Sequence, residues 1–315
     1  MMKIPVWMDC DTGTDDAIAI MLANGLDELE ILGLSSVCGN TTQENAYWNT
    51  HRINGLMGTS YPVYRGAEKP LMVPLQTAAH VHGENGLGDV ELPVPENAAV
   101  LPESAWDALY ACAKSHPHEL RLAATGPLTN VAIAFSKYPD LPRLLHSVTL
   151  MGGSAGRGNV TPAAEFNFYT DPQAASIVFR SGVKIVMCGL DVTLQAYFTM
   201  DDLNELEASG RPAAVFTKAC LMRSWSVLSK FGEDGFCMHD SCPVMYLAHP
   251  ELFEGEEAGV VIETRGSITN GKSVTDLYSD KQFPFSNALV LLKVDREKFI
   301  AILKDCILHT GAAGN

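Results

Sequence analysis

The segment VWMDCDTGTDDAIAIMLA at 6–23 constrains the fold of this chain more than any other stretch. An apolar run at 4–8 leads into it, and an apolar stretch at 17–23 ends it. The acids between them are Asp9, Asp11, Asp15 and Asp16. We interpret the segment as a strand, a tight turn and a helix, with Thr14 as a plausible N-cap. In an open α/β sheet such a turn lies at the carboxyl end of a strand, where ligands bind.

Carboxylates this close together repel one another unless a cation lies among them or water solvates some of them. A ligand set made only of oxygens favours a hard cation, Ca²⁺ or Mg²⁺. Asp15 or Asp16, taken singly, could equally be an acid of the first helical turn that faces water. For Asp9 and Asp11 together, directly after an apolar strand, we do not expect solvation.

Three patterns of metal site can be compared with this segment. An EF-hand loop that starts at Asp9 requires Gly and Glu where the chain has Thr14 and Ile20, so it is excluded. Phosphatases of the haloacid dehalogenase type begin with Asp-x-Asp-x-Thr, and here Gly13 occupies the last position. The pattern that fits throughout is Asp-x-Asp-x-Gly-x-Asp-Asp. The rest of the chain must distinguish these last two patterns.

Composition excludes several classes of partner. The chain has 315 residues, 47% of them hydrophobic, and a formal net charge of -15. This charge argues against a nucleic acid or an anionic membrane surface as partner, but it permits a neutral small molecule. No apolar run approaches the ~20 residues of a membrane span, and no signal peptide is evident. The eight cysteines lie mostly in apolar settings without a Cys-x-x-Cys pair, so we expect a cytoplasmic protein with reduced thiols.

Predicted strands and helices alternate along the chain, which favours a parallel sheet. We predict strands at 4–8, 30–38, 62–64, 119–124, 147–151, 184–188, 259–263, 274–278 and 288–294. Helices are predicted at 42–57, 102–115, 171–181 and 295–309, with a mostly helical portion at 200–249 and long excursions at 66–100 and 152–167. We therefore expect one α/β domain over 1–315, with a doubly wound, mostly parallel, Rossmann-like open sheet, flanking helices and a helical insert.

Polar residues follow several of these strands, among them Asp11, Asn40, Thr125 and 159–167. Because the carboxyl ends of parallel strands meet at one edge of a sheet, we expect these residues to gather there. Asn and Glu side chains at 159–167 suit sugar hydroxyls. Taken alone, however, that segment is more simply a polar surface loop. The pair His239-Asp240 is equally ambiguous, because an Asp often caps a helix.

Taken together, the motifs resemble the inosine/uridine-preferring nucleoside hydrolase family from end to end. The matching segments, in the family's order, are DCDTGTDD at 9–16, Gly39-Asn40, TGPLTN at 125–130, MGG at 151–153, NVTPAAEFN at 159–167, Asp171-Pro172 and His239-Asp240. The phosphatase pattern predicts none of the later segments. The resemblance implies a calcium-dependent hydrolysis of the N-glycosidic bond of ribonucleosides to ribose and free base, in nucleoside salvage. It also implies a homodimer or homotetramer.

The resemblance further implies a role for each matching residue. The calcium ligands would be Asp11, Asp16, Asp240 and the Thr125 carbonyl, and Asp11 would also activate water as the general base. The substrate-binding positions are Asp15, Asn167 and Asp240 at the ribose 2′- and 3′-hydroxyls, Asn159 and Glu165 near the 5′-hydroxyl, and Asn40 on the ribose side. Asp9 and Met151 match supporting positions. Nearby carboxylates would stabilise an oxocarbenium-like ribosyl transition state.

Two histidines and one aromatic residue would serve the departing base. His239 matches a leaving-group position, and an ordinary histidine pKa near neutrality suits an acid. His82 matches a histidine in the mobile loop of some members, although a solvated loop residue is nearly as plausible. Phe231 could stack a base, but an aromatic residue in a helical segment is often simply core. Asp89 departs from the family, because a small residue is expected there.

Two other functions stay open at this point. A Mg²⁺-dependent phosphohydrolase would use Asp9 as nucleophile, but no motif offers a Lys or Arg near the phosphate. A nucleoside- or ribose-binding protein without turnover would predict a damaged metal set, and here the set is intact. The preference for purine or pyrimidine bases is also open.

Overall fold

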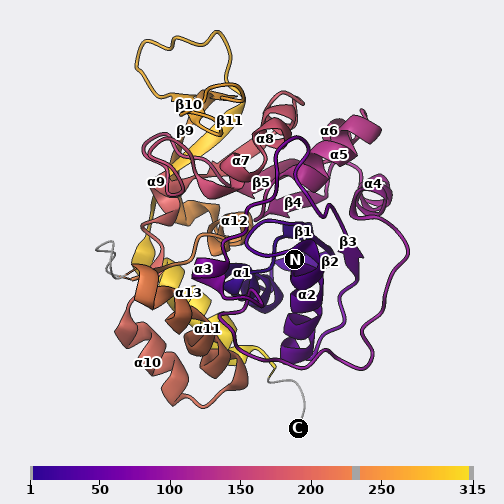
Figure 1. The fold of residues 1–315 in the computed structure, drawn as a ribbon, viewed down its shortest axis with the longest axis vertical. Helices are drawn as coiled ribbons and strands as arrows, with labels where there is room; N and C mark the ends of the chain where they lie inside the picture. Colours follow the sequence, from indigo (N-terminus) through magenta and orange to yellow (C-terminus); the bar gives the residue numbers. More distant parts are fainter. Residues whose placement is uncertain (1–2, 229–234, 312–315) are drawn as a thin grey trace.

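The computed structural model describes residues 3–228 and 235–311, and its centre is a nine-stranded sheet (Figure 1). The strand order is β10-β9-β11-β6-β5-β4-β1-β2-β3. The strands are β1 (Ile4–Cys10), β2 (Leu29–Ser36), β3 (Val63–Arg65), β4 (Arg121–Ala124), β5 (Ser147–Met151), β6 (Ile185–Cys188), β9 (Phe253–Ile262), β10 (Ser273–Asp276) and β11 (Ala288–Val294). Only β9 runs antiparallel to its neighbours. The predicted doubly wound, mostly parallel sheet is confirmed.

The sheet reverses its winding direction beside β1. The chain adds β2 and β3 on one side of β1, then crosses over and adds β4, β5 and β6 on the other. Such a reversal opens a crevice at the carboxyl ends of the strands on either side, where open α/β sheets bind ligands. The turns after β1, β2 and β4 therefore face one another.

Helices cover both faces of the sheet. They are α1 (Thr14–Gly25), α2 (Gln43–Met57), α3 (Ala79–His82), α4 (Ala105–Ser115), α5 (Thr129–Lys137), α6 (Leu141–Leu144), α7 (Phe166–Thr170), α8 (Pro172–Phe179), α9 (Leu190–Thr193), α10 (Met200–Ala208), α11 (Pro212–Leu228), α12 (Ser241–Ala248), η2 (Pro250–Leu252) and α13 (Arg296–His309). The helix α1 contacts α2, α11, α12 and α13, whereas α5 contacts α4 and α8. No described helix is long and apolar enough to cross a membrane.

Successive residues of the central strands enter two separate cores. In β1, Val6 and Met8 belong to one core and Trp7 to the other. In β6, Val186 and Ile185 divide in the same way. Because side chains alternate across a strand, a sheet buried on both faces needs apolar residues at nearly every position. This explains why the predicted strands have continuous apolar sequences.

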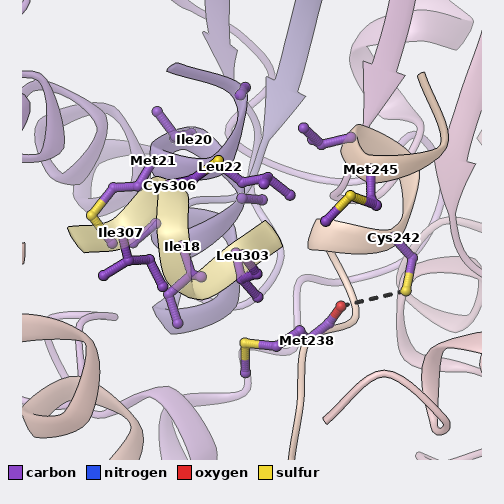
Figure 2. Close-up of a cluster of buried hydrophobic side chains, with 14 of the residues drawn as sticks. Ile18, Ile20, Met21, Leu22, Met238, Cys242, Met245, Leu303, Cys306 and Ile307 are labelled. Carbon is purple, nitrogen blue, oxygen red and sulfur yellow. Dashed lines mark hydrogen bonds between the residues drawn. The ribbon is translucent and has the colours of Figure 1, made fainter. Parts of the chain in front are cut away.

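The helix that follows β1 is fixed by close packing against the C-terminal helix. Figure 2 shows Ile18 and Met21 of α1 beside Leu303 and Ile307 of α13. At Gly25 a Cβ atom would lie 2.6 Å from the Cβ of Cys306, so only glycine permits this approach. The end of the chain thereby holds in place the helix whose first turn carries Asp15 and Asp16.

Some predicted details differ in the structure. Helix α1 begins at Thr14 and its N-cap is Gly13, so the assignment of Thr14 as N-cap is wrong. Asp16 Oδ2 accepts the Gly13 N–H at 2.9 Å, so an acid at the third helical position satisfies the N–H of the N-cap residue itself. The predicted helical portion is confirmed as α10, α11 and α12. One strand inside this portion, β8 (Phe236–Cys237), pairs antiparallel with β7 (Tyr197–Phe198), which lies just before the portion.

Candidate active site

Side chains from four strand ends meet at the reversal of the sheet. Asn40 N–H donates to Asp11 Oδ2 at 2.6 Å, which joins the turns after β2 and β1. Asn167 Nδ2 donates to the Thr125 carbonyl at 2.7 Å, which joins the loop after β5 to the turn after β4. The expected gathering of these residues at one sheet edge is confirmed.

The centre of the site is a cluster of buried carboxylates. Asp15, Asp16 and Asp240 each offer an oxygen, and these oxygens lie within 4.8 Å of one another. Burial, followed by the charge of Asp16, raises the pKa of Asp15 to about 7. Burial and the neighbouring acids hold the pKa of Asp240 well above its ordinary value. Among the described residues, no Lys, Arg or His forms an ion pair with any of the three.

Asp11 lies beside this cluster with one oxygen held and one without a partner. Its Oδ2 accepts the Asn40 N–H, whereas Oδ1 is buried without any hydrogen bond. At Gly39 a Cβ atom would lie 2.0 Å from Asp11 Oδ2, so a side chain at 39 would displace the carboxylate. Burial and then the charge of Asp16 raise the pKa of Asp11 well above its ordinary value. A carboxylate in this state readily takes up a proton or a cation.

Asp16 accepts more hydrogen bonds than the other acids of the cluster. Its Oδ2 accepts Gly13 N–H at 2.9 Å and Asn40 Nδ2 at 3.2 Å, and its Oδ1 accepts the Thr125 hydroxyl at 2.7 Å. The sequence predicted only the carbonyl of Thr125 as a functional group. Its hydroxyl also orients Asp16, so this one residue fixes an acid and presents a carbonyl oxygen.

Asp9 is held apart from the cluster by two residues that the sequence analysis missed. Its Oδ1 accepts hydrogen bonds from Ser35 Oγ and from Asn130 Nδ2. Burial raises the pKa of Asp9 to about 6, although these two hydrogen bonds oppose the shift. Asn130 also accepts the Ala67 N–H, so it ties Asp9 to the excursion after β3. The only signal for Asn130 was its place at the end of the motif TGPLTN.

The loop after β5 supplies a second group of polar residues. Asn167 Nδ2 donates to the Met151 carbonyl at 3.2 Å and contacts its sulfur, so Met151 supports Asn167. Both oxygens of Glu165 accept backbone N–H groups, including those of Gly153 and Asn167. Asn159 is exposed and caps the Phe166 N–H at 2.9 Å. The structure thus places Asn167 beside Thr125 and Met151, and Asn159 on the exposed part of the loop.

Two histidines lie on the other side of the cluster. His82 is only 8% exposed, and its Nδ1 lies 3.2 Å from the N atom and 3.1 Å from the hydroxyl of Thr14. His239 Nδ1 lies 2.8 Å from the hydroxyl of Thr193. Burial, followed by the nearby His239, lowers the pKa of His82 to about 3, and burial lowers that of His239 to about 4. Both rings are therefore neutral at pH 7. Phe231 lies outside the described residues.

An ion pair joins the loop that carries His82 to α11. Asp89, at a φ of 61°, accepts the Glu84 N–H at 2.8 Å and forms an ion pair with Arg223 of α11. The acid that departs from the expected small residue therefore stabilises the loop in two ways. These two interactions also offset the free energy that a non-glycine residue, here Asp89, loses in the left-handed region.

The cluster has the chemistry of a site for a hard divalent cation. Buried oxygens without any hydrogen-bond partner include Asp9 Oδ2, Asp11 Oδ1 and Asp15 Oδ1. Isolated buried carboxylates are costly, and a cation offsets that cost. All available ligand atoms are oxygens, which suits calcium or magnesium better than zinc. Asp11, Asp15, Asp16, Asp240 and the Thr125 carbonyl are the groups that could hold it.

Comparisons with known proteins agree with this geometry. The family model described as inosine-uridine preferring nucleoside hydrolase matches residues 6–301. A pyrimidine-specific ribonucleoside hydrolase, RihA, from Citrobacter koseri is 40% identical over 312 residues, which is 96% of this chain and 98% of that protein. The protein of the same name from Escherichia coli is 39% identical over the same shares.

Solved structures show the same fold. A plant nucleoside hydrolase, the PpNRh1 enzyme, superposes with a TM-score of 0.91 at 29% identity over 98% of this chain and 99% of that chain. A purine-preferring ribonucleoside hydrolase from Gardnerella vaginalis gives 0.91 at 30% identity over 98% and 100%. The chain is an N-ribohydrolase, an enzyme that cleaves the N-glycosidic bond of ribonucleosides. It belongs to the inosine-uridine preferring nucleoside hydrolase family.

The raised pKa values predict how the metal-free protein responds to pH. A carboxyl group with a raised pKa stabilises the fold in its protonated form, and that stability is lost as pH rises through the raised value. For Asp15 this value is about 7, and for Asp11 and Asp240 it lies well above the ordinary range. In chelator, the unfolding midpoint should therefore fall by several degrees as pH rises from about 4, the ordinary pKa of these acids, to about 7. The buried neutral histidines oppose this fall below about pH 6.5, where only the unfolded state protonates them, but the acids with raised pKa values outnumber them.

Calorimetry with chelator and with added calcium gives the measurement. Calcium should raise the midpoint, and its effect should grow with pH, because the cation replaces protons that the cluster loses. A midpoint in chelator that is flat or rising from about pH 4 to 7 would contradict the assignment of raised pKa values.

Proposed function

We propose that this enzyme hydrolyses pyrimidine ribonucleosides in nucleoside salvage, in the cytoplasm and as one domain over 1–315, with calcium as its cofactor. The observation that carries the proposal is the cluster of Asp15, Asp16 and Asp240, with the unpartnered Asp11 Oδ1 beside it. Relatives named as pyrimidine-specific are 40% and 39% identical, whereas the purine-preferring enzyme is 30% identical. This difference supports the choice of pyrimidine.

Calcium would be held by Asp11, Asp16, Asp240 and the Thr125 carbonyl. The Asp11 oxygen without a partner and the close carboxylates support this set. Calcium accepts many oxygen ligands in a flexible shell, whereas Mg²⁺ demands a tight octahedron. When bound, the cation supplies orientation of the ribose diol and a lower pKa for the attacking water.

Asp11 is the proposed general base. The Asn40 N–H fixes Asp11 Oδ2, so the carboxylate presents Oδ1 to a water molecule. As the water oxygen bonds to the anomeric carbon, its proton passes to Asp11 and the C–N bond breaks toward the base. The raised pKa of Asp11 belongs to the metal-free cluster, and with calcium bound Asp11 would stay ionised, as a general base must be.

The remaining carboxylates and amides would bind and stabilise the sugar. Positive charge develops on the ribosyl ring as the bond breaks, and the buried carboxylates lie where they can stabilise it. Asp15, Asp240 and Asn167 would hold the 2′- and 3′-hydroxyls, with Asn40 on the ribose side. Glu165 would act near the 5′-hydroxyl, mainly by orienting Asn167 through its backbone. Asn159 would contribute from the rim of the site.

His239 and His82 would act on the leaving base. Burial lowers the pKa of both rings, so neither is a cationic imidazolium in advance, and the expectation of an ordinary near-neutral pKa for His239 is wrong. A neutral imidazole still donates one N–H, which can hydrogen-bond the nitrogen or oxygen that gains charge on the departing base. The contact between His239 Nδ1 and Thr193 Oγ1 would set which ring nitrogen faces the base.

Self-association stays an expectation, and exposed apolar residues support it. Val261 of β9 and Val274 of β10 are paired neighbours that are 43% and 45% exposed. Tyr278 and Ile268 nearby in the chain are 71% and 83% exposed. Exposed apolar residues gathered at a sheet edge are typical of protein contacts.

The phosphohydrolase alternative does not fit the structure. Its nucleophile would be Asp9, which is 1% exposed and held by Ser35 and Asn130. The family assignment also excludes it. A binding protein without turnover is disfavoured, because the carboxylate set is complete.

The proposed function predicts which substrates release ribose and that none releases phosphate. The protein should release ribose from uridine and cytidine faster than from inosine, and it should release no phosphate from uridine monophosphate. Reducing-sugar and phosphate assays on the same panel provide the measurement. Equal rates on inosine would contradict the base preference, and phosphate release without ribose would contradict the proposal as a whole.

Asp11→Asn should lower kcat by ~10²–10⁴, because it removes the base while keeping the shape of the side chain. The metal-free variant should unfold at a higher temperature than wild type, because one of the mutually repelling charges is gone. Asp107→Asn is a matched control on the surface, where the acid pairs with Lys137, and its activity should be unchanged. Activity of Asp11→Asn within a few-fold of wild type would exclude Asp11 as the base.

His239→Ala separates leaving-group assistance from ribose binding. The variant should lose ~10²-fold in kcat on uridine, because the departing base loses a hydrogen-bond donor. On p-nitrophenyl riboside, whose leaving group needs no proton, the loss should stay within a few-fold. Steady-state kinetics on both substrates give the answer, and equal losses would place His239 in ribose or metal positioning instead.

A further inference from the structure

A polar cavity lies at the amino ends of the central strands, on the opposite side of the sheet from the carboxylate cluster at their carboxyl ends. Its volume is about 160 Å³, and its lining residues are Arg121, His146, Ser147, Thr149, Lys184, Val186, Tyr246, Leu247 and Pro250. On the same scale a water molecule needs roughly 10–15 Å³, so a small ion with some hydration fits. Residues 121, 147 and 184 stand at or just before the amino ends of β4, β5 and β6. The catalytic turns follow the carboxyl ends of the first two of these strands.

Three basic side chains line this cavity in a chain of net charge -15. Arg121 and Ser147 are register partners on adjacent strands, and the Lys184 carbonyl accepts the Val148 N–H on the next strand. Burial, followed by the positive charges of Arg121 and Lys184, lowers the pKa of His146. The side chains are therefore close enough to repel one another.

These basic groups lack acidic partners. Within residues 3–228 and 235–311, neither Arg121 nor Lys184 forms an ion pair. Arg121 Nη1 donates one hydrogen bond to the Leu247 carbonyl at 3.3 Å. A guanidinium has five N–H donors, so most of them stay available. Burial also lowers the pKa of Arg121, and Tyr246 only partly opposes this shift.

A buried hydroxyl in the same cavity points to a missing ligand. Thr149 is 1% exposed, and its Oγ1 has no hydrogen-bond partner. Buried hydroxyls almost always have a partner, so an unpartnered one beside a cavity indicates an absent water or ligand. Ser147, two residues earlier on the same strand face, adds a second hydroxyl, which contacts His146 Nδ1 at 3.1 Å.

We propose that this cavity, the basic pocket, binds a small tetrahedral oxyanion of the phosphate or phosphomonoester class. Such an anion offers several strong acceptor oxygens at once, which suits a guanidinium fork, an ammonium group and two hydroxyls. A carboxylate would use fewer of these donors. Neither a ribonucleoside nor ribose carries a charge, so the substrate and the sugar product of the catalytic site do not account for the pocket.

The basic pocket is joined to the catalytic site by one helix. Asp240 is the N-cap of α12, and Tyr246 and Leu247 near the end of α12 line the pocket. Strands β4 and β5 also run from the pocket toward Thr125 and Met151. The two sites are nevertheless distinct, so binding at the basic pocket can be measured without turnover.

The test is calorimetric titration of the full chain with inorganic phosphate and with glycerol 3-phosphate. The protein is treated with chelator beforehand, so that no metal in the carboxylate cluster can bind the anion. Sodium chloride at matched ionic strength serves as the control titrant. We expect saturable binding of one anion per chain in the millimolar range or tighter, about −4 kcal/mol for a Kd of about 1 mM.

Variants locate the anion. Lys184→Gln removes an exposed charge and should weaken binding about tenfold, as expected for loss of a charge-assisted contact. Thr149→Val keeps the shape of the side chain, removes the unpartnered hydroxyl and should also weaken binding. Lys114→Gln is the matched control, because Lys114 is an exposed lysine of α4 outside the pocket. Binding to this control should equal binding to wild type.

Three results would overturn the proposal. They are no saturable heat up to ~10 mM anion, unchanged binding in both Lys184→Gln and Thr149→Val, and equal weakening in the Lys114→Gln control. The last would mean that the anion responds to diffuse surface charge. Because the readout is binding to metal-free protein, it is independent of whether the enzyme hydrolyses pyrimidine ribonucleosides.

Discussion

Electrostatic repulsion among buried carboxylates is the constraint on which the rest of this structure depends. Asp11, Asp15, Asp16 and Asp240 lie together without a basic partner among the described residues, and burial raises the pKa of each. A fold tolerates such a cluster only if neutral donors orient the acids and a cation or protons offset the charge. The hydrogen-bond donors of Asn40 and Thr125 orient the acids and so allow them to lie close together.

Those donors come from different strand ends, and the winding of the sheet brings them together. Asn40 follows β2, Thr125 follows β4, and both donate to acids that follow β1. A glycine at 39 is necessary, because any side chain there would occupy the position of Asp11 Oδ2. The reversal of strand order beside β1 is thus what makes this convergence possible.

The sequence predicted the strands and the acids because both have local signals. Apolar runs mark strands buried on both faces, and the spacing of Asp9, Asp11, Asp15 and Asp16 marks the turn after the first strand. It could not predict groups that act through long-range contacts. Ser35 and Asn130 lie 26 and 121 residues from Asp9, and nothing local marks either as its partner.

Two local predictions failed, for different physical reasons. Thr14 was the expected N-cap by residue preference, but Asp16 accepts the Gly13 N–H and the helix begins one residue earlier. His239 was expected to have a near-neutral pKa, but burial lowers it. The first difference follows from a local hydrogen bond across the turn, whereas the second follows from tertiary burial, which residue type alone does not carry.

The two ends of the central strands carry opposite charge, and this separation has a consequence for binding. Acids gather where β1 ends, whereas Arg121 and Lys184 stand where β4 and β6 begin. The basic side chains lie too far along the sheet to pair with the catalytic acids, so neither group neutralises the other within the described chain. This separation supports the proposal that each end binds a small ion of opposite sign. The acidic end favours a cation beside a neutral nucleoside, and the basic end favours an oxyanion, which is why we expect the two ligands to bind without competing.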